Sequence, residues 1–165
     1  EDIVVLDKDK KIVEGKLLPS SETNLHASIY DNYRDVSAIV HTHSLYATSV
    51  STLLEELPAI HYQIADLGGP VKVAPYETFG TEALAIEVKK NLKGRKAVLM
   101  KNHGAVTVGS DLEKSASRAI LLEWLCSLYL LSKNSGNPAI IDDKEIENVK
   151  CQMSNFKNLR SSFLK

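Results

Sequence analysis

Two histidines follow a short apolar run in the segment AIVHTHSLY, where residues 38–40 precede His41 and His43. Side chains alternate between the two faces of an extended strand, so the imidazoles of residues i and i+2 lie on the same side. Neutral imidazole is a common metal ligand, and His103 in KNHGAVTVG is the best candidate for a third one. The adjacent Gly104 would allow a close backbone approach there. Three histidines with an open fourth position are typical of a catalytic divalent metal site.

A second group of polar residues, Pro19-Ser20-Ser21-Glu22, precedes a predicted helix. Two hydroxyls and the free N–H groups of a helix N-terminus can bind an anion such as a phosphate. Glu22 would then offer a carboxylate beside that phosphate for proton transfer. The segment therefore predicts a phosphate site with an acid/base group next to it.

Both patterns also have ordinary structural explanations. Two histidines near a strand end can satisfy local hydrogen bonds, and a Ser N-cap followed by Glu in the first turn is a common helix start. His26, one turn after Glu22, is an alternative fourth ligand, although a packed or hydrogen-bonded role is favoured. His61 is also expected to be structural, whereas its neighbour Tyr62 is harder to explain by structure alone.

Strands and helices alternate along the chain, which predicts an α/β fold with helices layered over a sheet. Strands are expected at residues 3–6, 11–14, 38–40, 59–64, 71–74, 97–100 and 105–108. Helices are expected at residues 22–33, 46–54, 81–92, 111–132 and 142–155. Asp111 is a good N-cap for the long helix that follows it.

The composition is that of an ordinary globular domain, with 165 residues, 44% hydrophobic and 25% charged. The net charge of −1 provides no field that would favour nucleic acid or an anionic membrane as a partner. No apolar run is long enough to span a membrane, and no signal-peptide pattern opens the chain. Two isolated cysteines, Cys126 and Cys151, are too few for a disulfide framework and favour a reduced, cytoplasmic protein.

Five segments in the same order resemble the class II aldolase/adducin family: PSSE, DVSAIVHTH, LPAIHY, VAPYETFGT and KNHGAVTVG. The resemblance runs from residue 2 to about residue 132 and is closest to the L-fuculose-1-phosphate aldolase group. It implies a layered α/β/α domain with a central, mainly antiparallel sheet over residues 1–165. Relatives carry a further segment before the position of Glu1, with Gly-Asn and Thr-Gly pieces of the phosphate pocket. The chain is therefore expected to lack the N-terminal part of its domain.

The resemblance also implies a metal-dependent cleavage of a phosphorylated ketose into dihydroxyacetone phosphate and an aldehyde. His41, His43 and His103 match the family's zinc ligands, and three imidazoles with a carboxylate would also accept Mn²⁺ or Co²⁺. Glu22 matches the catalytic acid/base. A divalent ion stabilises the charge of the enediolate, so no activated lysine is required.

The remaining site residues are implied by the resemblance alone. Ser20 and Ser21 match the two serines that bind the substrate phosphate, and Phe79 matches an aromatic residue near the aldehyde. Tyr62 matches a tyrosine that donates a proton to the aldehyde oxygen in the neighbouring subunit's site. The resemblance accordingly implies a homotetramer with its sites between subunits and a small phosphorylated sugar as the substrate.

Two related functions are alternatives. Ribulose-phosphate 4-epimerases use the same retro-aldol step, but they resemble SSD at the position of Glu22 and carry an Arg-His pair where this chain has Leu45-Tyr46. An adducin-like module would keep the fold without catalysis, which fits poorly with three retained histidines and Glu22. The aldolase is therefore the favoured interpretation.

Overall fold

A five-stranded sheet forms the centre of the computed structural model, which describes residues 2–163. Its strands lie in the order β3 (Ala38–Thr42), β7 (Gly104–Gly109), β6 (Ala97–Met100), β5 (Val71–Ala74) and β4 (Glu56–Leu57). The pair of β5 and β6 is parallel, and the other three pairs are antiparallel. The predicted, mainly antiparallel central sheet is therefore confirmed.

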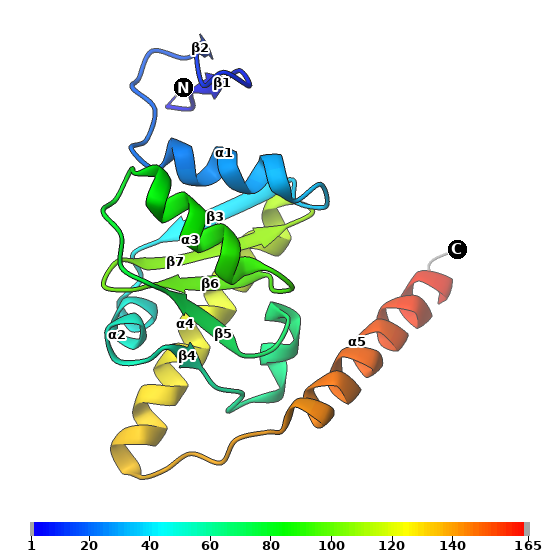
Figure 1. Cartoon of the computed structure of the whole chain (residues 1–165). Coiled ribbons are helices and arrows are strands. Elements are labelled where there is room, and N and C mark those ends of the chain that lie inside the picture. Colours follow the sequence, from blue (N-terminus) through cyan, green and yellow to red (C-terminus); the bar gives the residue numbers. More distant parts are fainter. Residues whose placement is uncertain (1, 164–165) are drawn as a thin grey trace.

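Helices cover both faces of this sheet (Figure 1). One face packs against α1 (Thr23–Asn32) and α3 (Glu82–Leu92), and the other against α2 (Leu45–Leu53) and α4 (Leu112–Ser135). In β6, Val98 and Met100 point into the first core, whereas Ala97 and Leu99 point into the second. A strand buried on both faces needs an unbroken apolar sequence, and AVLM provides one.

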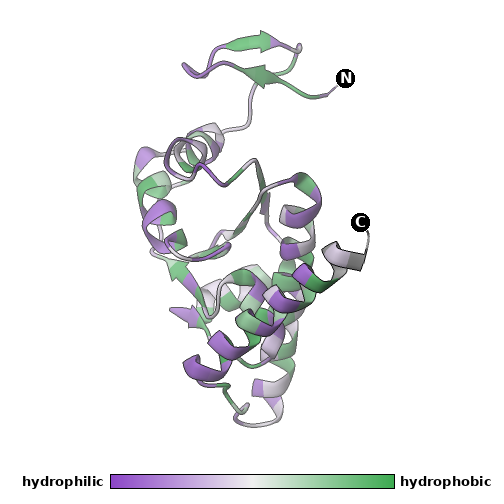
Figure 2. Ribbon diagram, turned by 90° about the vertical axis from the view of Figure 1, so that its right-hand side faces the viewer, coloured by the Kyte–Doolittle hydropathy of each residue, from purple (hydrophilic) through white to green (hydrophobic). Residues whose placement is uncertain are grey.

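Two terminal elements flank this layered body. The predicted hairpin forms as β1 (Val5–Leu6) and β2 (Ile12–Glu14) and lies beyond α1, apart from the central sheet (Figure 1). The last helix, α5 (Asp143–Phe163), is longer than predicted. Its first turns pack against the core that lies on the α2 and α4 side of the sheet, and the rest of the helix extends away from the body. Figure 2 shows hydrophilic and hydrophobic residues on different sides of the helices. Within residues 2–163, no helix combines the length and apolar character that a membrane crossing needs.

The strand predicted at residues 59–64 is wrong. The edge strand that pairs with β5 is β4, which ends before Pro58, a residue without an N–H for the ladder. Instead, a 3₁₀ helix, η1 (Tyr62–Leu67), begins where the His61 side chain accepts a hydrogen bond from the Gln63 N–H. His61 therefore has the structural role expected of it.

The helix starts also differ in part from expectation. Asp111 caps α4 by accepting the Lys114 N–H at 2.8 Å, as predicted. The N-cap of α1, however, is Glu22 rather than a serine, and its side chain does not cap the helix. The Glu22 carboxylate points instead toward the loop before α3. It is therefore not used by the helix start and can take part in the predicted site.

Candidate metal centre

The structure brings together the three histidines that the sequence predicted to meet. One potential ligand nitrogen from each of His41, His43 and His103 lies within 4.8 Å of the others. The ring centroids are 4.7 to 5.1 Å apart, and the Nε2 atoms of His41 and His43 are separated by 3.0 Å. His26 does not belong to this group, so the preference for a packed role there agrees with the geometry.

Strand pairing and a tight turn produce this convergence. His41 is the last residue but one of β3 and pairs with Val106 of β7, so its side chain lies on the sheet face covered by α1 and α3. His103 is in the turn between β6 and β7, where its N–H donates to the Met100 carbonyl and Asn102 adopts a left-handed φ of 55°. The turn folds His103 back beside the end of β3.

Gly104 allows the two strand ends to approach as closely as they do. A Cβ atom at this position would collide with the Thr42 carbonyl oxygen and lie only 3.0 Å from Cδ2 of His43. Any side chain would therefore separate the segments that carry His43 and His103. The sequence predicted a close backbone approach at Gly104, and the structure shows which atoms approach.

A hydrogen bond to His41 and the burial of His41 and His103 leave these two imidazoles in a form that can bind a metal. The Ala105 carbonyl accepts the Nδ1–H of His41 at 2.9 Å, which leaves the Nε2 lone pair of His41 directed at the cluster. Burial lowers the pKa of His41 and of His103. The hydrogen bond to Ala105 opposes this at His41, whereas the charge of His43 lowers both pKa values further and that of His41 lowers the pKa of His103. Neutral imidazole is therefore favoured, and this is the form that binds a metal.

Glu22 is a buried carboxylate beside this cluster, with 6% of its surface exposed. Its Oε1 accepts the Gly80 N–H at 3.1 Å, whereas Oε2 has no hydrogen-bond partner among the described residues. The charge of Glu22 raises the pKa values of His41 and His103, opposing the dominant effect of burial. A buried carboxylate oxygen without a partner needs a cation or a proton donor. Three converging imidazoles with this carboxylate beside them fit a divalent metal ion.

Gly80 holds the Glu22 carboxylate and was not recognised from the sequence. It has a φ of +75°, and a Cβ there would lie 3.1 Å from the Ser21 carbonyl oxygen. Asn24 of α1 donates to the Gly80 carbonyl at 3.2 Å, so both peptide groups of Gly80 are bonded to the start of α1. The glycine in VAPYETFGT was the only available signal, and it does not identify its distant partner.

The predicted substrate residues lie near this corner of the fold, except Tyr62. Ser20 and Ser21 are exposed just before α1, and Ser20 Oγ accepts the Glu22 N–H at 3.2 Å. Phe79 is 64% exposed and directly precedes Gly80. Tyr62 is 51% exposed in η1, and no hydrogen bond or ring contact within residues 2–163 joins it to the three histidines. The serines and Phe79 thus lie next to Glu22 and to Gly80, which bonds the Glu22 carboxylate, whereas no such link joins Tyr62 to the histidines.

Residues 1–130 match the model of the Class II Aldolase and Adducin N-terminal domain. The chain belongs to this family. Over 149 residues it is 39% identical to 5-deoxy-D-ribulose 1-phosphate aldolase of Bacillus thuringiensis serovar kurstaki, covering 90% of this chain and 70% of that protein. Over 146 residues it is 42% identical to L-fuculose phosphate aldolase of Escherichia coli K12, covering 87% of this chain and 67% of that protein.

A solved structure of an L-fuculose 1-phosphate aldolase has the same fold, with a TM-score of 0.89 and 40% identity. The alignment covers 93% of this chain and 72% of that one. The chain is accordingly a lyase of the class II aldolase type. Its relatives are named for different sugar phosphates, so the family alone does not determine the substrate.

Proposed function

We propose that the protein is a metal-dependent aldolase that cleaves a ketose 1-phosphate, such as L-fuculose 1-phosphate, into dihydroxyacetone phosphate and an aldehyde. The observation that supports this most strongly is the buried Glu22 carboxylate, with one unpartnered oxygen, beside three converging imidazoles. This arrangement combines a ligand set for a divalent ion with a group that can move a proton. 5-Deoxyribulose 1-phosphate is the second substrate to test, because the Bacillus relative is named for it.

His41, His43 and His103 would hold the ion, which we propose to be Zn²⁺, with Mn²⁺ or Co²⁺ as possible substitutes. The bound ion supplies Lewis-acid stabilisation of the negative charge on the substrate oxygens. The protein's own residues orient the substrate and move two protons. In the direction of cleavage, one proton leaves the hydroxyl at C4 and the C3–C4 bond breaks. The electron pair of that bond is retained as an enediolate.

Glu22 then delivers a proton to C3, which completes dihydroxyacetone phosphate. Tyr62 of a neighbouring subunit accepts the proton from the C4 hydroxyl, and this requires a homotetramer or another closed ring. The 51% exposure of Tyr62, away from the histidines of its own chain, is compatible with that role. The exposed hydroxyls of Ser20 and Ser21 bind the phosphate at the start of α1, and Phe79 lines the aldehyde end.

The experiment that tests this function measures dihydroxyacetone phosphate release from both ketose phosphates by the metal-loaded protein. Glu22→Gln should retain one metal per chain but lose activity by about 10²–10⁴-fold, because the amide keeps the shape and cannot transfer the proton. Asp31→Asn, on the exposed part of α1, is the control for removing a carboxylate from the same helix. Near-normal turnover in Glu22→Gln, or epimerisation of a pentulose phosphate without release of dihydroxyacetone phosphate, would contradict the proposal.

A further inference from the structure

The first turn of α2 is closed by a residue that lies far away in the sequence. The carboxylate of Glu123 in α4 accepts the N–H of Tyr46 at 2.9 Å with one oxygen and the N–H of Ala47 at 2.8 Å with the other. These are the second and third N–H groups of the helix, which a local N-cap side chain would normally bond. A negative charge at this end also interacts favourably with the helix dipole.

A local cap is present in the sequence but is not used. Ser44 occupies the N-cap position, yet its side chain makes no capping hydrogen bond. The Ser44 hydroxyl lies 3.4 Å from the Thr42 hydroxyl instead. The start of α2 therefore depends on Glu123, and this connects α4 to the peptide segment directly after His43.

The position of His43 depends on that segment. His41 is fixed by the Ala105 carbonyl, whereas His43 is exposed and its hydrogen-bond partner in the described part of the chain is His41. One residue, Ser44, separates His43 from the first turn of α2. The backbone at residues 43–47 must consequently determine where the His43 imidazole lies.

We propose that Glu123 is a positioning residue for the histidine cluster. Its carboxylate holds the N-terminus of α2 and thereby places His43 against His41 and His103. This inference rests on the metal site of the proposed function, and it adds a residue that contacts neither metal nor substrate.

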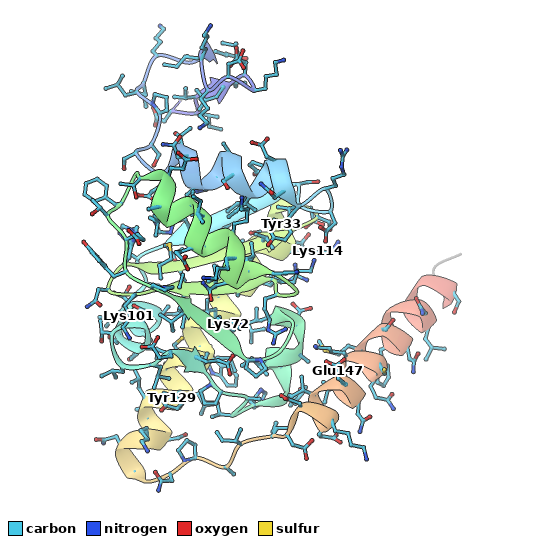
Figure 3. All side chains as sticks on the ribbon, in the orientation of Figure 1. Tyr33, Lys72, Lys101, Lys114, Tyr129 and Glu147 are labelled. Carbon is cyan, nitrogen blue, oxygen red and sulfur yellow. The ribbon has the colours of Figure 1, made fainter. Side chains whose placement is uncertain are left out.

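The opposite end of α2 is connected to the same cluster. Lys101, in the turn that carries His103, donates to the Leu54 carbonyl at the C-terminus of α2 at 3.2 Å. It also forms an ion pair with Glu55 at 2.7 Å. Figure 3 shows Lys101 beside α2, at the end of the sheet where the turn between β6 and β7 lies. The helix is thus held at both ends by groups whose charges complement its dipole, and it links the segments of His43 and His103.

The first test uses the metal-free protein, so its result does not depend on metal binding. In Glu123→Gln and Glu123→Ala, we expect amide exchange in the first turn of α2 to rise about 10–100-fold, as expected for loss of hydrogen bonds to a charged group. The imidazole NMR resonances of His43 should shift in both variants. Val50→Ala, at a fully buried position of α2, is the control that destabilises the helix without touching its N-terminus. Unchanged His43 resonances in both Glu123 variants would overturn the inference.

The second test measures Co²⁺ affinity by chelator competition, together with the visible absorption spectrum of the bound ion. Loss of an outer group that orients metal ligands typically weakens binding about 10–100-fold, and we expect this for Glu123→Gln. Val50→Ala should bind Co²⁺ as the wild type does when each protein is measured the same number of degrees below its own unfolding temperature. A wild type that binds no Co²⁺ would refute the metal site itself. Wild-type affinity and spectrum in Glu123→Gln would refute only the role of Glu123.

Discussion

Replacing Gly104 by alanine tests how the site is built, because a single methyl group would enter the contact between β3 and β7. Gly104 is not among the glycines with positive φ, so alanine can adopt its backbone conformation. The added Cβ would instead collide with the Thr42 carbonyl oxygen and lie 3.0 Å from His43 Cδ2. The strand end that carries His43 would have to move away from the turn that carries His103.

The size of the expected loss of stability in Gly104→Ala depends on which atoms must move to make room for the methyl group. Forcing an extra methyl into a packed site costs about 1–3 kcal/mol. We expect the upper part of that range, because Thr42 presents its backbone, not a flexible side chain, to the new atom. The resulting shift of His43 should weaken metal binding about 10–100-fold, the effect typical of disturbing the groups that orient metal ligands.

The assay combines urea unfolding of the metal-free protein with metal affinity from chelator competition. Gly109→Ala is the matched control, because Gly109 lies at the other end of β7 and also lacks a positive φ. Its Cβ would lie 2.7 Å from the Ser115 N and 2.8 Å from the Asp111 carbonyl oxygen, which are also backbone atoms. Both variants should lose stability, and only Gly104→Ala should lose metal affinity beyond that loss. Equal metal affinities in the two variants would refute the explanation.

Two further predictions concern the ligands and the assembly. His41→Ala should lose bound metal and aldolase activity together, because it removes the ligand that Ala105 orients; elemental analysis that finds a full metal complement would contradict this. Mixing inactive Glu22→Gln subunits with inactive Tyr62→Phe subunits should restore part of the activity, because a hybrid interface can pair an intact Glu22 with an intact Tyr62. No recovery after demonstrated subunit exchange, or activity from a monomer in light scattering, would show that one chain builds the whole site.

The parts of the site that follow local rules could be predicted from the sequence. The period of a strand places His41 and His43 on one side, and the glycine after His103 indicates a close backbone contact. These two rules made the meeting of the three histidines a hypothesis, and the family resemblance strengthened it. The layered fold was similarly predictable, because each buried strand has an apolar sequence and each major helix has an apolar face.

The incorrect and missing parts depend on contacts that the sequence does not encode locally. IHYQI has the composition of a strand, but Pro58 and the His61 side chain favour a 3₁₀ turn, which places Tyr62 outside the sheet. Glu123 bonds to amides that are 76 and 77 residues away, and Gly80 bonds to Glu22 across 58 residues. Such pairs become visible only when the elements that carry them have packed.

The most direct test of the proposed function is the rate of dihydroxyacetone phosphate release before chelation, after chelation and after metal is returned. The protein is stripped with a chelator, dialysed, checked by elemental analysis and reloaded with Zn²⁺ in increments. We predict that activity disappears with the metal and returns in proportion to added Zn²⁺ until one ion is bound per histidine cluster. A protein verified to be metal-free that still cleaves the ketose phosphate at its original rate would contradict a metal-dependent aldolase at His41, His43 and His103.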